Sequence, residues 1–263
     1  MGEIDKKSID KLISEINLLT ISPLGRGGSF FFQSLLNLHP EIITLPDITN
    51  FHFNEYVNID DFIKKNESSF DLKKAYYNNI EISNIIDDQI DIRIYKENYL
   101  LLTKLRPPVN KKENFIYYYL SFALIYNYDI KKIKYIAIHI HYFGGKEQLI
   151  FDYNRYFPKL KISILTKDIK LTYESTSKIF MSRYESFNMD MLLFRIEKNL
   201  LEYQSFKKLL LTLPNNIKLI DINLLHKDGE QHMRNYSSWL EIDYNNSMLK
   251  SKIGQSEWQG NRS

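Results

Sequence analysis

Short segments rich in apolar residues recur along the chain, and most are followed by a longer stretch with helical spacing. The apolar runs lie at 18–21, 42–45, 134–142, 160–166 and 217–222. They are rich in isoleucine and leucine, which is typical of strands buried in a parallel sheet. Helical spacing predicts helices at 5–16, 30–38, 146–156, 169–186, 190–212 and 228–240. This alternation predicts an α/β fold, a three-layer α/β/α arrangement with a central parallel sheet.

Residues 51–133 interrupt the alternation. They are polar and rich in asparagine and tyrosine, with helical patches at 59–65 and 113–127 separated by Arg106-Pro107-Pro108. A chain of 263 residues suits one α/β domain. We therefore interpret 1–263 as a single domain that carries an insertion or lid at about 51–133.

Composition narrows the class of protein. The hydrophobic fraction is 44% and the charged fraction 25%, which are ordinary for a soluble globular protein. The net charge of +3 is too small to indicate a nucleic-acid partner. The absence of cysteine excludes thiolate metal sites and thiol nucleophiles. Because no apolar run has the length of a membrane span or a signal peptide, we expect a cytoplasmic protein without an integral membrane segment; its oligomeric state stays open.

A glycine-rich turn, Gly25-Arg26-Gly27-Gly28-Ser29, joins the first strand to the following helix. Glycines let the backbone fold tightly and expose its N–H groups, and the helix N-terminus adds positive potential. Arg26 can grip phosphate oxygens as a fork, and Ser29 can donate its hydroxyl. The nucleoside-triphosphatase loop needs Lys-Ser/Thr at its end, and that pair is missing here. The turn predicts a phosphate site of another kind, or a glycine-rich turn without a ligand.

The segment from Ile21 to Ile42, with His39-Pro40 near its end, resembles the opening motif of sulfotransferases that use 3′-phosphoadenosine 5′-phosphosulfate (PAPS). The resemblance implies the P-loop NTPase-like sulfotransferase fold of bacterial members. It also implies that Arg26 is the basic residue of a loop around the 5′-phosphosulfate, formed by Gly25, Gly27, Gly28 and Ser29. Phe30 stands in the same loop, where the family usually has a second hydroxyl.

A second motif follows the predicted strand at 160–166. In the family, a basic residue after this strand and a serine eight positions later hold the 3′-phosphate of the nucleotide. Lys167 and Ser175 have that spacing here, so the resemblance implies that both bind the cofactor. Lysine keeps the charge of the usual arginine and loses its fork, and Ile169 replaces the usual proline.

A third motif lies near the end of the sequence. Trp239-Leu-Glu-Ile242 resembles the family's last helix, and the segment 250–261 resembles the loop that covers the nucleotide. The resemblance implies that Lys252 and Gly254 belong to this loop. Many members of the family continue beyond it.

The candidates for the catalytic base are histidines. His139 and His141 are two apart on one predicted strand and therefore point to the same face. One branch of the family has Lys-x-His on this strand, which implies that His141 is the base and that His139 stands in place of the lysine. The alternative is a pair of core histidines bonded to the backbone.

Another branch uses a glutamate in a segment similar to 49–54. Asn50 stands in place of that glutamate, so His52 or Asp47 is the substitute. His39 fits a helix end and is expected to be structural, whereas His226 and His232 receive no role.

The resemblance implies transfer of a sulfuryl group from PAPS, as co-substrate, to a hydroxyl of a carbohydrate, lipid or small-molecule acceptor. PAPS supplies its own leaving group, so no metal is expected. Besides the basic residue Arg26, the transfer needs the base discussed above. Two alternatives stay open: a degenerate relative that binds a nucleotide or glycan, and a kinase-type phosphate-loop transferase.

Overall fold

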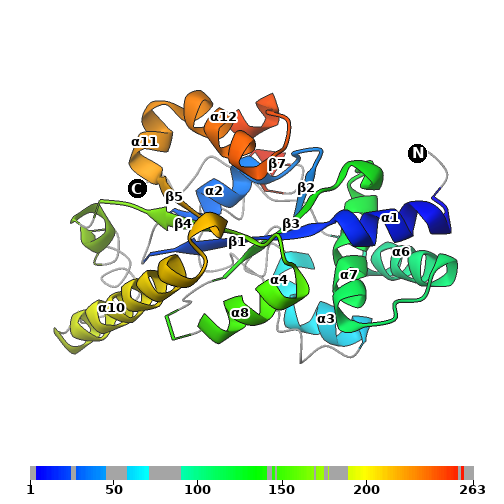
Figure 1. Cartoon of the computed structure of the whole chain (residues 1–263), viewed down its shortest axis with the longest axis horizontal. Helices are drawn as coiled ribbons and strands as arrows, with labels where there is room; N and C mark the ends of the chain where they lie inside the picture. Colours follow the sequence, from blue (N-terminus) through cyan, green and yellow to red (C-terminus); the bar gives the residue numbers. More distant parts are fainter. Residues whose placement is uncertain are drawn as a thin grey trace.

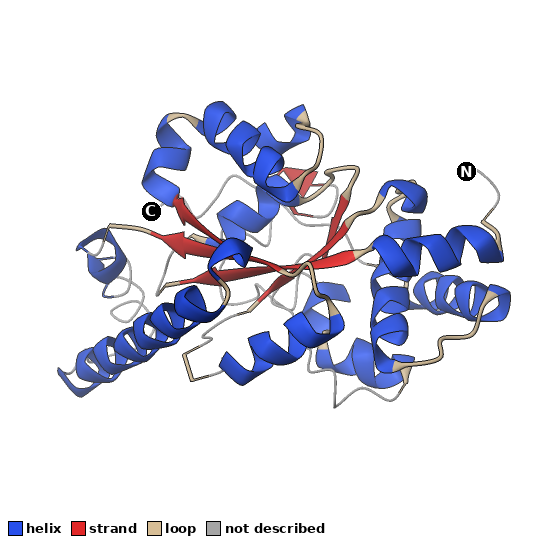
Figure 2. Cartoon of the chain, viewed as in Figure 1, coloured by secondary structure: helices blue, strands red, loops and turns tan. Residues whose placement is uncertain are grey.

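Five parallel strands form the centre of the protein in the computed structural model (Figure 2). The structure describes residues 4–24, 28–45, 58–70, 90–140, 144–145, 147–168, 170–174, 177, 189–253 and 256–257. The strand order is β2-β3-β1-β4-β5, so the first strand of the chain lies in the middle. The strands are β1 (Asn17–Pro23), β2 (Ile42–Thr44), β3 (Tyr135–His139), β4 (Lys161–Thr166) and β5 (Ile217–Asp221).

Alternate residues of the strands face two separate hydrophobic cores. On β1, Leu18 belongs to one core, whereas Leu19 and Ile21 belong to the other. Since successive side chains of a strand point to opposite faces, a sheet covered on both faces needs apolar residues at consecutive positions. This requirement explains why apolar residues occupy neighbouring positions in the strands, and the predicted three-layer α/β/α architecture is confirmed.

Helices cover both faces of the sheet (Figure 1). One face carries α2 (Ser29–Leu36), α11 (Ile222–Lys227) and α12 (Gly229–Leu240). The other face carries α1 (Lys6–Glu15), α7 (Lys111–Ile125), α8 (Glu147–Tyr156) and α10 (Met189–Thr212). No helix in the part of the chain that the structure describes is long and apolar enough to cross a membrane.

The stretch interpreted as an insertion contains four described helices: α3 (Ile59–Lys65), α4 (Glu67–Phe70), α6 (Ile92–Leu105) and α7. In α7, eleven of fifteen residues are buried, and its aromatic side chains belong to the same core as the sheet. This burial places α7 in the body of the domain. A lid role for the rest of the stretch stays a prediction.

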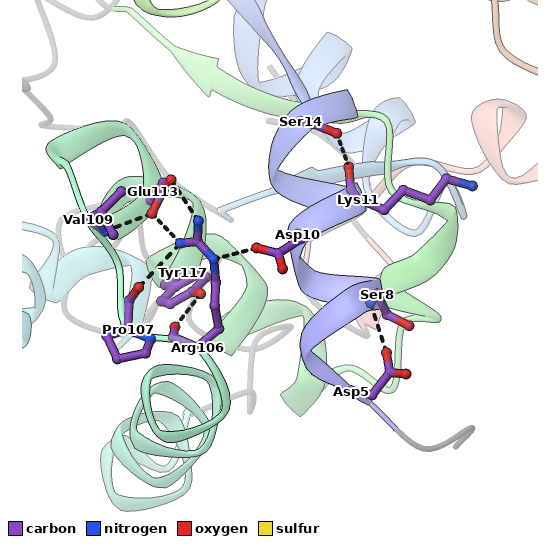
Figure 3. Close-up of polar contacts among 10 residues, drawn as sticks. All are labelled: Asp5, Ser8, Asp10, Lys11, Ser14, Arg106, Pro107, Val109, Glu113 and Tyr117. Carbon is purple, nitrogen blue, oxygen red and sulfur yellow. Dashed lines mark hydrogen bonds and ion pairs between the residues drawn. The ribbon is translucent and has the colours of Figure 1, made fainter.

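Arg106 ties this stretch to the N-terminal helix (Figure 3). Its Nε donates to Asp10 of α1 over 2.7 Å, and its other guanidinium nitrogens donate to Glu113 of α7. Burial raises the pKa of Glu113, but hydrogen bonds from Arg106 and from the Val109 backbone N–H hold it below its usual range. Glu113 is therefore ionised, and Arg106 forms ion pairs with both Glu113 of α7 and Asp10 of α1, which link the two helices.

The predicted boundaries agree with most elements within two residues. The strand predicted at 134–142 is shorter, because β3 ends at His139. Helices α6 and α11 were not predicted. Three short 3₁₀ helices and a small antiparallel hairpin complete the described elements: Ile130–Lys132, Pro214–Asn216, Asn246–Leu249, and β6 (Lys252–Ile253) with β7 (Ser256–Glu257).

Candidate active site

The carboxyl ends of β1, β3 and β4 meet at one edge of the sheet. Ile21 pairs with His139, and Pro23 pairs with Leu165. The Leu24 N–H then donates to the Leu165 carbonyl over 2.9 Å, so the segment leaving β1 stays beside β4. The helix after β1 lies on one face of the sheet, and the helices after β3 and β4 lie on the other. Ligands of open parallel sheets bind where connections diverge in this way.

Of the three glycines in this turn, Gly28 is the one that the structure describes. Its φ of 71° and ψ of 31° lie in the left-handed region, which a side chain disfavours. A Cβ on Gly28 would also lie 3.1 Å from Cγ2 of Ile222, the first residue of α11. Both observations explain why glycine stands at this position. Gly25, Arg26 and Gly27 lie outside the described residues.

Helix α2 begins directly after Gly28 and has no side-chain cap at its N-terminus. The first N–H groups of a helix lack intrahelical acceptors and carry partial positive charge, which suits a phosphate or sulfate group. Ser29 opens the helix and is buried. An uncapped helix start after a left-handed glycine therefore fits the anion site that the sequence predicts here.

His139 is the last residue of β3 and is fully buried. Its ring meets the ring of Phe30 edge to face, with centroids 5.3 Å apart. Phe30, at the start of α2, is therefore in direct contact with His139. His141 lies outside the described residues, so the shared face of the two histidines stays a prediction.

Lys167 directly follows β4 and is half-buried. The next residue, Asp168, begins a helical segment: its carboxylate accepts from the Leu171 N–H and its carbonyl accepts from the Thr172 N–H. Residues 170–174 are helical, as the predicted helix at 169–186 requires. The structure thus places Lys167 at the edge of the sheet that holds the glycine turn, while Ser175 lies outside the described residues.

The C-terminal hairpin packs against α2. Ser251 and Ser34 share a hydrogen bond between their hydroxyls, although they are 217 positions apart in the sequence. Lys252 follows in β6, where it pairs with Glu257 of β7. Lys252 therefore lies near α2, whose Ser34 is in the second half of the helix, and its role in a closing loop stays a prediction; Gly254 lies outside the described residues.

The turn after β3 is held by α10. The Gly145 N–H donates to the Ser205 hydroxyl over 2.8 Å. A Cβ on Gly144 would lie 2.9 Å from the backbone nitrogen of Glu202, so the turn packs directly on the helix backbone. His141 precedes this turn by three residues. Contact with α10 therefore restricts one end of the segment that carries the predicted base.

Two other histidines, His39 and His226, differ in burial and contacts. His39 is buried, accepts from the Glu41 N–H at Nδ1 and contacts the Asp243 carbonyl through Nε2, and burial lowers its pKa. This contact set agrees with the structural role expected for it. His226 on α11 is exposed and stacks on Phe31 of α2 at 4.3 Å. Sequence reasoning missed this contact because α11 had no periodic signal. His52 lies outside the described residues.

Comparison with known proteins places the fold. No family model matches the sequence, and no curated protein matches it. The sulfotransferase domain of the Synechococcus PCC 7002 olefin synthase superposes with a TM-score of 0.59 at 12% identity, over 92% of this chain and 79% of that one. The sulfotransferase domain of the curacin biosynthetic pathway gives 0.55 at 13% identity, over 91% and 78%.

Sulfotransferase STF9 from Mycobacterium avium gives a TM-score of 0.50 at 10% identity, over 92% of this chain and 68% of that one. The similarity thus extends over almost the whole chain. The chain has the sulfotransferase fold.

Proposed function

We propose that this protein is a sulfotransferase that moves a sulfuryl group from PAPS to a hydroxyl of an acceptor. One observation carries the proposal: in a sulfotransferase fold, the left-handed Gly28 precedes the uncapped start of α2 at the carboxyl end of the central strand. A side chain at Gly28 would meet Ile222, so glycine is required directly before the helix start at which a phosphate would bind.

Two groups of residues bind the two ends of the nucleotide. PAPS, when bound, supplies both the sulfuryl group and its leaving phosphate. Arg26, Ser29 and the first N–H groups of α2 hold the 5′-phosphosulfate and oppose the negative charge that develops there. Lys167 and Ser175 hold the 3′-phosphate, and Lys252 approaches from the C-terminal hairpin. His141 takes the acceptor proton.

The acceptor is a hydroxyl compound. Two of the structural neighbours are, by name, domains of an olefin synthase and of a biosynthetic pathway. The names of these two neighbours favour a lipid or small-molecule acceptor over a carbohydrate, among the three acceptor classes that the sequence left open.

Nucleotide binding tests the donor. We expect adenosine 3′,5′-bisphosphate to raise the melting temperature clearly, adenosine 5′-monophosphate to raise it less, and ATP with Mg²⁺ to leave it unchanged. Lys167→Ala should remove most of the difference between the first two nucleotides. Lys161→Ala is the matched control, because Lys161 begins the same strand at its opposite end. No response to any nucleotide would contradict the proposal, and a response to ATP with Mg²⁺ alone would indicate a kinase-type transferase.

A nucleotide- or glycan-binding relative without catalysis is the second candidate. The observation that favours it is Phe30, which occupies the place of a hydroxyl and covers His139. Transfer of labelled sulfate from PAPS to a panel of alcohols, lipids and sugars separates the two. Binding of the bisphosphate without transfer to any acceptor class would support the second candidate.

A further inference from the structure

Helix α10 has two contrasting faces. Glu202, Ser205, Phe206 and Leu209 are buried against the rest of the molecule. The opposite side of the helix is exposed, and Figure 1 shows α10 at the outside of the molecule with one end beyond the sheet. A helix that packs on one side normally has polar residues on the other. The exposed side of α10 does not follow this rule.

Large apolar side chains gather on the exposed side. Among the described residues, sixteen large hydrophobic side chains are exposed, and seven of them belong to this one helix: Leu193, Phe194, Leu200, Leu201, Tyr203, Leu210 and Leu211. Leu211 is 86% exposed. Single exposed apolar residues are common on soluble proteins, whereas a continuous set of this kind indicates an interaction surface.

Three of these apolar residues, Leu193, Leu200 and Leu211, lie on a line along the helix with the spacing of a coiled-coil seam, and the same seam contains Glu197, Gln204 and Lys207. The positions alternate by four and three residues along the helix: Leu193, Glu197, Leu200, Gln204, Lys207 and Leu211. In a heptad these are the a and d positions, which form the contact between two helices. The buried Glu202 and Leu209 occupy the f position on the opposite side, so the seam points away from the protein's own core.

The seam is complementary to itself in the antiparallel direction. When two copies of α10 cross at Glu202, residues at equal distances on either side of it face each other. This register places Leu193 opposite Leu211 of the second copy and Leu200 opposite Gln204. It also places Glu197 opposite Lys207, so both charged positions of the seam meet the opposite charge. A parallel arrangement would instead place each charge against its own kind.

We propose that α10 is a homodimer interface, in which the exposed seams of two copies pack antiparallel about a twofold axis. Two-fold symmetry requires that a surface be complementary to itself, and the register centred on Glu202 meets this requirement for both charge and apolar contact. The interface lies on the side of α10 opposite the Gly144-Gly145 turn, so dimer formation leaves the candidate active site open.

The length of the helix sets the strength of the contact. A helix of 24 residues is roughly 36 Å long, and one pair of such helices lies at the small end of stable interfaces. We therefore expect a dimer that dissociates in the micromolar range.

Sedimentation equilibrium of the full chain between about 1 and 100 µM tests the proposal. We expect a monomer–dimer equilibrium. Glu197→Lys or Lys207→Glu alone should weaken the dimer roughly tenfold or more, because each places like charges in two symmetric contacts. The double variant Glu197→Lys/Lys207→Glu should restore it. Both positions are exposed, so the variants should fold, and circular dichroism checks that they do.

Leu200→Glu should abolish the dimer, whereas Leu100→Glu is the matched control, because Leu100 is similarly exposed on α6. A chain that stays monomeric at 100 µM would overturn the proposal, as would a dimer that none of the α10 variants weakens. Binding to vesicles of neutral phospholipid that Leu200→Glu abolishes, without dimer formation, would assign the surface to a membrane instead. These results do not depend on nucleotide binding or sulfuryl transfer.

Discussion

The ring of Phe30 stands edge-on to the ring of His139, at the junction between the first turn of α2 and the last residue of β3. This contact joins the two segments from which the sequence predicts phosphate binding and proton transfer. The resemblance to sulfotransferases implies a hydroxyl at the position of Phe30, where this chain has an aromatic ring. The effect of an aromatic ring instead of a hydroxyl at position 30 can be measured directly.

Phe30→Thr should tighten the binding of adenosine 3′,5′-bisphosphate roughly fivefold, because a hydroxyl returns a hydrogen-bond donor to the start of α2. The same change should lower the free energy of unfolding by about 1 kcal/mol, since the edge-to-face contact is lost. Calorimetry and urea unfolding measure the two effects. Phe31→Thr is the control, because it also removes an aromatic contact but lies where the family has no such hydroxyl. Equal effects of both variants on binding would refute the interpretation.

Gly28→Ala should destabilise the protein more than Gly145→Ala. Both glycines have a φ of 71°, so alanine costs about 1 kcal/mol at each. Only Gly28 also has Ile222 within 3.1 Å of the added Cβ, whereas the added Cβ at Gly145 would have nothing within 4 Å. The difference in unfolding free energy between the variants reports that contact. We also expect Gly28→Ala to weaken nucleotide binding at least tenfold.

Gly144→Ala should slow sulfuryl transfer while leaving nucleotide affinity nearly unchanged. The new Cβ would lie 2.9 Å from the backbone nitrogen of Glu202, so either the turn or α10 must move. The turn follows His141 in the sequence and packs on α10, on the opposite face of the sheet from α2, so we expect the shift to affect the base and not the nucleotide. A rate equal to that of the unchanged protein would show that the position of the turn has no influence on catalysis.

His141→Ala should reduce the transfer rate roughly 100-fold if His141 is the general base. The pH dependence of the rate should then lose the limb in which a histidine loses its proton. His232→Ala is the control, because this histidine lies on α12 and receives no role from the sequence. An undiminished rate would transfer the role to His52 or Asp47.

His39 should make stability fall as the pH falls. Burial lowers its pKa in the folded protein below the ordinary 6.5, so the unfolded chain binds an additional proton below that pH. Its contribution is fully present above pH 6.5 and is lost as the pH falls toward the folded pKa, with a slope of at most about 1.4 kcal/mol per pH unit. Urea unfolding between pH 8 and 5 measures the slope. In His39→Gln the slope should be smaller; an unchanged slope would assign it to other groups.

The sequence predicted the three-layer fold because β1 to β4 are buried on both faces and are therefore rich in apolar residues at consecutive positions. It did not predict α6 or α11, for different physical reasons. Helix α6 lies within the polar stretch 51–133 that we interpreted as an insertion, and several of its apolar residues are exposed, so its few buried positions did not stand out. Helix α11 has only six residues, which is too few for any period to be recognised.

Residues of the candidate site were predictable from the sequence where the backbone conformation requires one particular residue type. Gly28 belongs to this class, since its left-handed conformation and the nearby Ile222 both require glycine. The contact between Ser34 and Ser251 was not predictable, because no local sequence pattern indicates a hydrogen bond between distant segments. The same holds for His226, whose stacking on Phe31 depends on how α11 meets α2. The roles assigned to Arg26, His141 and Ser175 stay predictions.

The central position of β1 also affects how the protein is made. This strand leaves the ribosome first, but its two neighbours are β3 and β4, whose pairing residues begin at Tyr135 and Lys161. Both edges of an apolar strand therefore stay unpaired until more than half of the chain has been synthesised. Unpaired apolar strands associate readily with other chains, and such long-range pairing forms slowly. The nascent chain should consequently depend on chaperones during this interval, and translation that pauses before β3 should favour aggregation.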